Sequence, residues 1–307
     1  MKTALVTGGA GFVGTNLIKR LLSEGYKVVS IDNYSTGFVS NQQKGAVYYE
    51  YDIESITDFN PFSRTGTFDV VYHLAAIARI QPSFNQPLEY FQANATATFN
   101  IAMYCAKNNI PLQFAGSSSH HSGKFQNPYT FSKDVSEEIV MLCQQLYGLK
   151  ATITRFYNVY GPHHLKEGGY CTVIGKWEKA IELGLPITIY GDGSQTRTFC
   201  YITDAITGFL KVLVETEKPD VYNVGNPEPE LDMATLAKLF SEISKSNEGF
   251  ELVKYPSSYP EDEPNRRCPN IKKISTELGY TPKVDLNDGL ARFISWSQAN
   301  YTDELTS

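Results

Sequence analysis

Short apolar runs alternate with amphipathic stretches along the first half of the chain. The runs are too short for helices, so we predict a strand for each of residues 3–7, 28–32, 47–52, 70–74, 112–117 and 152–156. Between them, apolar residues recur at helical spacing over 12–22, 88–107 and 135–147. Regular alternation of strand and helix predicts an α/β fold with a doubly wound parallel sheet of the Rossmann type.

The pattern changes after Gly161, where glycine-rich turns become frequent and helical spacing returns at 173–183, 233–244 and 286–298. We therefore predict two domains. The first covers residues 1–165, and the second is a smaller C-terminal α/β domain over 166–307, with some of its segments returning to the first.

Composition and charge narrow the class of protein. The chain has 307 residues, of which 42% are hydrophobic and 20% charged, and its net charge of -6 does not favour binding to nucleic acid. No apolar run approaches the roughly 18 residues of a membrane span, so we expect no membrane association. The chain opens on Met1 and Lys2 directly before a predicted strand, without a signal peptide, so we expect a cytoplasmic protein. Its five cysteines lack CxxC spacing, which favours reduced thiols over a metal site.

A glycine-rich turn joins the first predicted strand to the first predicted helix. Gly8 would allow a tight turn, Gly11 would let the backbone approach a pyrophosphate, and Gly14 would let the helix pack on the sheet. Asp32 ends the next strand, where a carboxylate binds ribose hydroxyls and repels a 2′-phosphate. No lysine or arginine follows within five residues, so we predict NAD rather than NADP as the cofactor. Asp52 and Ile53 end the third strand, where they could meet the adenine or, alternatively, only cap a turn.

Tyr129 and Lys133 stand four residues apart, so on a helix they share one face. Asn127 and Pro128 precede them as helix cap and first helical residue, which puts Tyr129 in the first turn. A phenol is a poor base near neutral pH, but a neighbouring ammonium, an oxidised nicotinamide and a helix N-terminus all favour phenolate. Such a phenolate can take the proton of an alcohol while its carbon is oxidised.

Three serines, Ser117, Ser118 and Ser119, stand at the carboxyl end of the fifth predicted strand, at the sheet edge where such folds bind ligands. One serine hydroxyl could relay a proton between the substrate and Tyr129.

Motifs along nearly the whole chain now point to a family. They are TGGAGFVG at 7–14, IDN at 31–33, HLAA at 73–76, PxxYxxxN at 87–94, PYTFSK at 128–133, RFYNVYGP at 155–162, YGDGSQTRTFCYITDA at 190–205 and YNVGN at 222–226. On these motifs the chain resembles the extended short-chain dehydrogenase/reductases, in the nucleotide-sugar epimerase/dehydratase branch typified by UDP-galactose 4-epimerase.

The resemblance implies roles for individual residues. It implies an NAD-binding first domain, a second domain mainly for the nucleotide sugar, and a homodimer. It adds cofactor contacts from Phe12, Val13, Asn33, Leu74, Ala75, Ala76, Asn94, Ser117 and Phe156. For the substrate it implies Ser118, Ser119 and Tyr129 at the sugar, Asn158 and Arg197 at the diphosphate, and Arg267 near the sugar's C2.

The chain departs from the family pattern in the segment after the serines, which in the family usually ends in Val-Tyr-Gly. Counting back from Gly123 implies Ser118 as the family's usual Ser/Thr, whereas a one-residue gap would select Ser119. Dehydratases of the family carry Asp-Glu there and UDP-glucuronate decarboxylases typically a glutamate, but no acid lies between Ser117 and Tyr129, which argues against water loss. His120 and His121 stand in the segment instead. Adjacent side chains point apart on an extended chain, so we expect no shared metal ion and assign His120 to substrate contact.

A second departure concerns the family's late arginine, in an R-P-G-D/E segment, which is missing. Residues 259–264 stand in its place, and Arg266 and Arg267 follow as candidates for the missing charge.

The leading hypothesis is a nucleotide-sugar 4-epimerase with permanently bound NAD, acting on a UDP-sugar of the UDP-glucose or UDP-N-acetylglucosamine type. Tyr129 would take the proton of the C4 hydroxyl through Ser118 while hydride passes to NAD, and the 4-keto sugar would turn about its diphosphate and be reduced on its other face. The alternatives are a nucleotide-sugar reductase or dehydrogenase of the same family and, from another class, a non-catalytic NAD-binding regulator.

Overall fold

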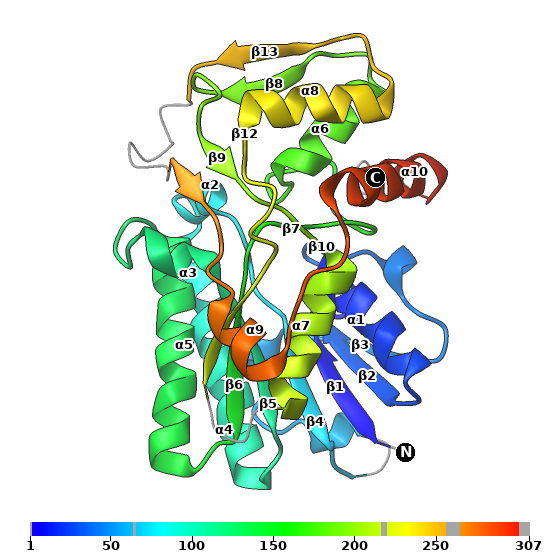
Figure 1. Cartoon of the computed structure of the whole chain (residues 1–307). Helices are drawn as coiled ribbons and strands as arrows, with labels where there is room; N and C mark the ends of the chain where they lie inside the picture. Colours follow the sequence, from blue (N-terminus) through cyan, green and yellow to red (C-terminus); the bar gives the residue numbers. More distant parts are fainter. Residues whose placement is uncertain (1, 64–65, 216–219, 256–264, 301–307) are drawn as a thin grey trace. The chain divides into compact units, whose positions relative to one another are not determined.

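The chain folds into two compact units (Figure 1). The computed structural model describes residues 2–63, 66–215, 220–255 and 265–300. The first unit comprises Met1–Phe156 and Ile206–Tyr222, and the second comprises Tyr157–Ala205 and Asn223–Ser307. The division into an NAD-binding and a substrate domain stays a prediction.

The first unit is built on a seven-stranded sheet. Its strands are β1 (Thr3–Thr7), β2 (Lys27–Asp32), β3 (Val47–Glu50), β4 (Val70–His73), β5 (Leu112–Ser117), β6 (Ala151–Phe156) and β11 (Val221–Val224). They lie in the order β11-β6-β5-β4-β1-β2-β3, and β1 to β6 pair in parallel. The order reverses beside β1, which makes the carboxyl ends of β1 and β4 the expected ligand position of a doubly wound sheet. The predicted fold class and all six predicted strands are confirmed.

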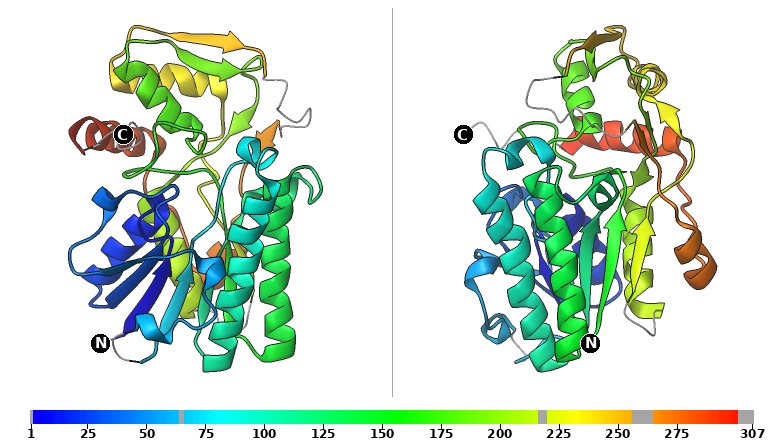
Figure 2. Two further views of the ribbon diagram at one scale, coloured as in Figure 1. Left: turned by 180° about the vertical axis from the view of Figure 1, so that it is seen from behind. Right: turned by 90° about the vertical axis from the view of Figure 1, so that its left-hand side faces the viewer.

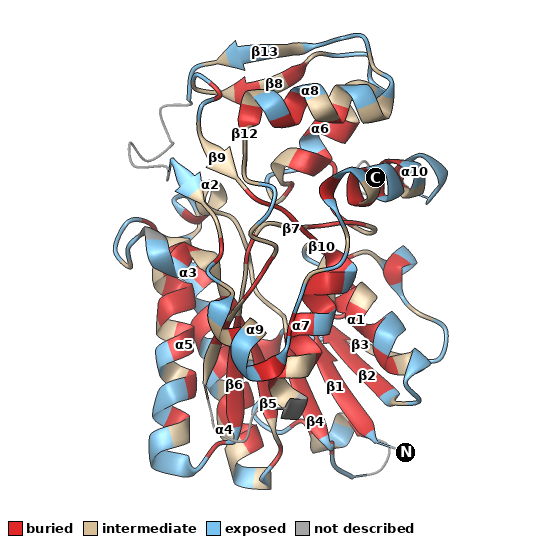
Figure 3. Ribbon diagram, in the orientation of Figure 1, coloured by how far each residue is buried: buried red, intermediate tan, exposed pale blue. Residues whose placement is uncertain are grey.

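Helices cover both faces of this sheet (Figure 2). They are α1 (Phe12–Ser23), α2 (Ile80–Ser83), α3 (Pro87–Phe91), α4 (Ala97–Asn108), α5 (Pro128–Tyr147) and α7 (Ile202–Glu215), with 3₁₀ turns η1 (Val39–Asn41), η2 (Ile53–Ser55), η3 (Asn60–Phe62) and η5 (Ser118–Ser122). Buried side chains of α4 and α5, such as Ile101 and Val140, pack on strand residues such as Leu112 and Ile153. On the other face, the Phe209 ring of α7 contacts Tyr72 and Phe156. Burial on both faces explains why the strands read as continuous apolar runs (Figure 3).

One predicted helix contains a local change of winding. The sequence predicts a single helix over 88–107, but the structure has α3, then five residues of π-helix in η4 (Gln92–Thr96), then α4. A π-helical turn contains one residue more than an α-helical turn, which changes the direction of its side chains. Such turns often occur at functional sites. Asn94 lies at its centre.

The second unit has short strands and four helices among its described residues. The strands are β7 (Val159–Tyr160), β8 (Ile187–Tyr190), β9 (Thr196–Arg197), β10 (Cys200–Tyr201), β12 (Leu231–Asp232), β13 (Phe250–Val253) and β14 (Arg266–Arg267). The helices are α6 (Val173–Glu182), α8 (Met233–Ser244), α9 (Lys272–Leu278) and α10 (Leu286–Asn300). The strands form three small sheets, β10-β7, β12-β9-β14 and β13-β8. The predicted helices over 173–183, 233–244 and 286–298 correspond to α6, α8 and α10.

Within the described residues, no helix combines the length and apolar character needed to cross a membrane.

A buried carboxyl group in the second unit titrates far from its ordinary range. Glu178 on α6 is 3% exposed. Burial raises the pKa of its carboxyl to about 7, and the nearby Lys166 ammonium offsets part of that rise. The folded protein therefore favours the protonated carboxyl, whereas the unfolded chain releases the proton near pH 4.5. The contribution of this group to the free energy of unfolding is complete below pH 4.5 and declines as pH rises through about 7.

We predict that Glu178→Gln removes this pH dependence. The variant should gain roughly 2–3 kcal/mol in free energy of unfolding relative to wild type on going from pH 5 to pH 8, because each unit of pKa shift corresponds to about 1.4 kcal/mol. Urea unfolding at both pH values measures the difference, with the exposed Glu242→Gln on α8 as the matched control. An equal effect of Glu178→Gln at pH 5 and pH 8 would contradict the prediction.

Candidate active site

The turn between β1 and α1 is closed by glycines that no other residue could replace without movement. Gly8 has φ +72°, and a Cβ there would lie 2.8 Å from the backbone nitrogen of Ala75. A Cβ on Gly14 would lie 2.0 Å from the Gly8 carbonyl oxygen. The first-turn N–H groups of α1 have no partner within the helix, and no acidic residue stands in that turn. This arrangement suits an anion such as a pyrophosphate.

Asp32 holds the glycine turn from the end of β2. Its carboxylate accepts hydrogen bonds from the backbone N–H groups of Ala10 (2.8 Å) and Tyr34 (2.8 Å). Burial raises the pKa of Asp32, and these backbone hydrogen bonds counter part of the rise. A carboxylate offers about four acceptor sites, so beside these backbone contacts the group can still accept a bond from a ribose hydroxyl.

The other residues predicted to contact the cofactor follow the carboxyl ends of neighbouring strands. Leu74, Ala75 and Ala76 follow β4, Phe12 and Val13 open α1, and Phe156 ends β6. After β2 and β3, the Asn33 amide donates to the Asp52 carboxylate at 2.7 Å and joins the two strand ends. The Ile53 side chain packs in the hydrophobic core, which leaves only its backbone for contact with a ligand.

The N-terminus of α5 places Tyr129 as the sequence predicts. The Asn127 side chain caps the helix by accepting from the backbone N–H of Thr130 at 2.8 Å, and Pro128 occupies the first turn. The Tyr129 ring meets the buried Tyr90 ring edge to face at 6.2 Å between centroids.

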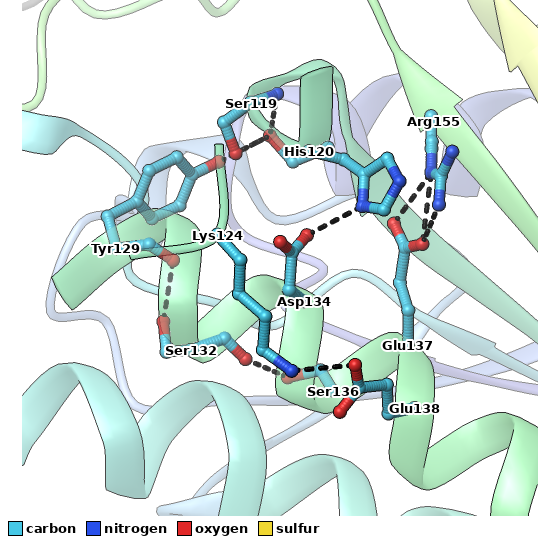
Figure 4. Close-up of polar contacts among 11 residues, drawn as sticks. Ser119, His120, Lys124, Tyr129, Ser132, Asp134, Ser136, Glu137, Glu138 and Arg155 are labelled. Carbon is cyan, nitrogen blue, oxygen red and sulfur yellow. Dashed lines mark hydrogen bonds and ion pairs between the residues drawn. The ribbon is translucent and has the colours of Figure 1, made fainter. Parts of the chain in front are cut away.

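The phenol oxygen of Tyr129 lies 3.0 Å from the hydroxyl of Ser117, at the end of β5 (Figure 4). Ser119 donates to the same Ser117 oxygen from its hydroxyl (2.9 Å) and from its backbone N–H (3.2 Å). The hydroxyl that contacts Tyr129 is therefore that of Ser117, not Ser118 as the count from Gly123 suggested, because the turn η5 begins immediately after the strand. Among the described residues, the half-buried Ser118 hydroxyl has no hydrogen-bond partner. Its role as a proton relay stays a prediction.

Lys133 is buried one turn after Tyr129. Its ammonium donates to the Ala115 carbonyl at 2.8 Å and lies 4.4 Å from the centroid of the Phe114 ring. Burial lowers its pKa to about 8, and the Glu137 carboxylate offsets part of the drop. Ala115 takes one of the three ammonium protons, and the other two remain for a ligand.

The sequence analysis missed a buried ion pair behind Lys133. Arg155 on β6 donates to both carboxylate oxygens of Glu137 on α5, at distances from 2.6 to 3.1 Å. The two side chains are 13% and 3% exposed. Glu137 lies four residues after Lys133 and so shares its helix face, and that spacing is the signal that could have identified it.

Asn94 joins three segments around this cluster. Its amide oxygen accepts from the Ile77 N–H at 2.8 Å, and its amide nitrogen donates to the Ile77 carbonyl and to the Ser132 hydroxyl. Its backbone carbonyl accepts from the Thr98 and Ser136 hydroxyls. Contact between Asn94 and a cofactor stays a prediction. Its hydrogen bonds show that it connects α4, α5 and the loop after β4.

His73 extends these contacts to the glycine turn. Its Nδ1 lies 2.6 Å from the Thr7 hydroxyl, and its Nε2 lies 3.1 Å from the Thr98 hydroxyl. Burial, reinforced by the Lys133 charge, lowers its pKa to about 3, so the imidazole is neutral.

His120 lies on η5 with its Nδ1 2.9 Å from the Asp134 carboxylate of α5. The rings of His120 and His121 meet edge to face at 5.4 Å between centroids.

The residues predicted to contact the diphosphate belong to the second unit. Asn158 has φ +41°, and its amide donates to the Thr198 carbonyl at 2.8 Å. Arg197 on β9 and Arg267 on β14 are direct partners in parallel register, so both half-buried side chains leave the same face of the small sheet. The Arg197 guanidinium donates to the backbone carbonyls of Thr196 (2.8 Å) and Asn265 (3.3 Å).

Arg266 differs from its neighbour. It is 67% exposed and makes a two-pronged contact with the Glu230 carboxylate at 2.7 and 2.8 Å. Its charge is therefore already matched within the protein. Residues 259–264, where the family's late arginine is missing, lie outside the described residues.

Known proteins share this fold. The sequence profile of the NAD dependent epimerase/dehydratase family matches residues 4–225. A UDP-N-acetyl-alpha-D-glucosaminuronate decarboxylase of Bacillus cytotoxicus is 30% identical, over 96% of this chain and 97% of its own. A putative UDP-glucose 4-epimerase of Methanocaldococcus jannaschii is 31% identical, over 96% and 98%. The UDP-glucuronic acid 4-epimerase of Bacillus cereus, solved with UDP-glucuronic acid and NAD, superposes with a TM-score of 0.86 at 27% identity, over 97% of this chain and 100% of that one.

A doubly wound sheet with a glycine turn and a Tyr–Lys pair on one helix defines a nicotinamide-dependent enzyme class. The chain belongs to the NAD-dependent epimerase/dehydratase family, whose members act on nucleotide sugars. The predicted resemblance is confirmed.

We predict that Asp32→Ala weakens NAD binding about 10- to 100-fold, the scale of hydrogen bonds to a charged group, and relaxes discrimination against NADP. Calorimetric titration with both cofactors measures this. Asp32→Asn is the matched comparison, because it keeps the shape and removes the charge, although its amide nitrogen cannot accept one of the two backbone N–H bonds. It should lose selectivity, with affinity less reduced than in Asp32→Ala. Equal affinity of the wild-type protein for NAD and NADP would refute the role of Asp32.

Proposed function

We propose that the protein is an NAD-dependent 4-epimerase of nucleotide sugars, with UDP-sugars favoured. The observation that carries the proposal is the contact of Tyr129 with Ser117 at the sheet edge, one helical turn from the buried Lys133 and on the side of the glycine turn. We infer that the first unit binds NAD and that the second mainly binds the nucleotide sugar.

The residues at the carboxyl ends of the strands and at the start of α1 are suited to bind NAD. The N-terminus of α1 would receive the pyrophosphate, Asp32 a ribose, and the two remaining ammonium protons of Lys133 the other ribose. When bound, NAD supplies the two-electron acceptor and donor that no side chain provides.

The protein's own part in the chemistry is proton transfer. Tyr129, as phenolate, takes the proton of the C4 hydroxyl and returns it after the sugar has turned over. Ser117 orients the phenol, while Ser118 presents a hydroxyl to the substrate. The charge of Glu137 favours the ammonium form of Lys133.

Two arginines of the second unit are suited to bind the nucleotide diphosphate during such a reaction. The sugar ring must present each of its two faces in turn without dissociating from the protein, so the binding energy has to come from the nucleotide diphosphate. Arg197 and Arg267 provide two cations from one face of the β12-β9-β14 sheet.

A second candidate is decarboxylation of a UDP-uronic acid, which several relatives, including the one from Bacillus cytotoxicus, are named for. Against it stands the segment from Ser117 to Tyr129, which contains no carboxylate. Epimerisation needs no further acid beyond Tyr129 and is therefore preferred.

Product analysis with UDP-glucose, UDP-N-acetylglucosamine and UDP-glucuronic acid tests the proposal. We expect interconversion of C4 epimers without net change in NADH and without CO₂ release. CO₂ release would favour the decarboxylase, net NADH would favour a reductase or dehydrogenase, and binding of NAD without any turnover would favour a regulator.

We predict that Tyr129→Phe keeps NAD bound but lowers turnover at least about a hundredfold, the scale of losing a general acid–base group. Progress curves and the NAD content of the purified variant measure both effects. Tyr147→Phe, at the exposed end of the same helix, is the control and should retain activity. Turnover near the wild-type level in Tyr129→Phe would remove Tyr129 from the mechanism.

We predict that Arg197→Ala and Arg267→Ala each weaken UDP binding by about 2 kcal/mol or more, because each removes a charged partner of the diphosphate. Arg266→Ala should change it little, since that guanidinium is exposed and already paired with Glu230. Calorimetry with UDP and the retained NAD content give the comparison. A larger loss in Arg266→Ala than in Arg267→Ala would reverse the assignment of the two arginines.

We further propose that the protein is a homodimer. Apolar side chains are exposed along α4 and α5, among them Phe99 (40%), Met141 (40%), Leu142 (44%) and Leu146 (61%). Exposed apolar patches on helices commonly mark association surfaces, and two copies of this helix pair can cover each other's patch.

We predict that Leu142→Asp converts a dimer to a monomer in sedimentation velocity, because it places an unpaired charge in the apolar interface. Leu252→Asp is the control, as Leu252 is similarly exposed (53%) but lies on β13 in the second unit. A wild-type protein that sediments as a monomer would refute the homodimer.

A further inference from the structure

The buried ion pair of Glu137 with Arg155 takes no part in the proton transfer of the proposed epimerisation. Arg155 donates to both carboxylate oxygens at 2.6 to 3.1 Å (Figure 4). Glu137 is 2% exposed, and a carboxylate at that depth is costly unless it is paired. A guanidinium that contacts both oxygens also fixes the orientation of the carboxylate. Arg155 therefore determines where the negative charge of Glu137 lies.

Strand β5 leaves space for this carboxylate at Gly116. A Cβ on Gly116 would lie 2.6 Å from Glu137 Oε1 and 3.1 Å from the Cγ of Arg155. The φ angle of Gly116 is not in the left-handed region, so the glycine is explained by space and not by backbone conformation. Glycine weakens the interior of a strand and often marks a place where another group approaches closely. Here the group that approaches is the ion pair.

Two elements bring the carboxylate beside the Lys133 ammonium. On β5, the residue before Gly116 is Ala115, whose carbonyl accepts a hydrogen bond from Lys133 at 2.8 Å. On α5, Lys133 and Glu137 stand four residues apart and share one helix face. The ammonium and the carboxylate therefore meet the same short stretch of β5, at consecutive residues.

The other groups around Lys133 supply no comparable negative charge. His73 on β4 is a neutral imidazole, and the Tyr129 phenol lies one turn earlier on α5. Arg155 on β6 is a cation. Burial lowers the pKa of the Lys133 ammonium to about 8, and the Glu137 carboxylate keeps that pKa from falling further.

We propose that Glu137, held by Arg155 in the space at Gly116, sets the upper pH limit of NAD binding by keeping the Lys133 ammonium charged for the cofactor ribose. Glu137 and Arg155 are positioning residues, because both act on the cofactor only through Lys133. The inference rests on the ribose contact that the proposed function gives to Lys133. It adds two residues, and a pH range, to that site.

Calorimetric titration with NAD between pH 6 and pH 9.5 tests the inference. The wild-type protein should bind NAD with constant affinity up to about pH 7 and more weakly above about pH 8, where Lys133 loses its proton. In Glu137→Gln the decline should begin about one pH unit lower, because the carboxylate no longer favours the ammonium. At pH 6 the two proteins should agree within about threefold, since Lys133 is charged in both.

Further variants separate charge from packing. Glu137→Gln leaves the buried Arg155 unpaired, which can prevent folding. Glu137→Gln combined with Arg155→Gln removes both charges, and its upper pH limit should lie between those of the wild type and the single variant, because the cation is also gone. Glu138→Gln is the matched control. Glu138 is 62% exposed and pairs with Lys124, so this variant should keep the wild-type limit.

The pH limit distinguishes the inference from a structural role and from the proposed function. A merely structural pair would lower NAD affinity by the same factor at every pH, and an unchanged limit in a folded Glu137 variant would overturn the inference. Wild-type affinity that is equal at pH 6 and pH 9.5, or absent at both, would overturn it as well. No sugar is present in this titration. The expected shift in a protein that does not epimerise UDP-glucose would therefore overturn the epimerase and keep the inference.

Discussion

The side-chain amide of Asn94 bonds to the loop after β4 and to α5 at once, while its carbonyl accepts hydroxyls from α4 and α5. Asn94 is 1% exposed, and a buried amide that lost one of these partners would be costly to leave unsatisfied. The three segments therefore have one favourable arrangement. Ser132, which receives the amide N–H, in turn donates to the Tyr129 carbonyl. The orientation of the N-terminal turn of α5 thus depends on the hydrogen bonds of Asn94.

Much of the first unit could be predicted because its signals are local. Buried parallel strands read as apolar runs, and Asn127 with Pro128 specifies a helix start within three residues. The π-turn at Asn94 could not be predicted, because apolar periodicity over 88–107 is insensitive to a single change in hydrogen-bond register. It forms because Asn94 gains partners from residues 17 and 38 positions away, at Ile77 and Ser132.

In the candidate site, too, some residues can be predicted from local sequence and others depend on long-range contacts. Short-range spacing in the sequence is enough to predict four of its parts, namely the glycine turn, Asp32, Tyr129 and Lys133. The choice of Ser117 as the partner of Tyr129 depends on where β5 ends, and the choice between Arg266 and Arg267 depends on a carboxylate 36 residues away in sequence, Glu230. Glu137 and Arg155 meet across α5 and β6, so neither reveals its partner in the sequence. Local patterns thus predict the candidate site, whereas long-range contacts determine the partners that neighbouring residues within it have.

The parallel pairing of Arg197 with Arg267 has a thermodynamic consequence. If a diphosphate binds between Arg197 and Arg267, it contacts side chains of both strands and so stabilises the pairing of two strands about seventy residues apart in sequence. Each tenfold rise in free ligand above its dissociation constant then adds about 1.4 kcal/mol to the folded state. The nucleotide would then stabilise the folded protein as well as hold the sugar. The protein would be less stable when its substrate is scarce.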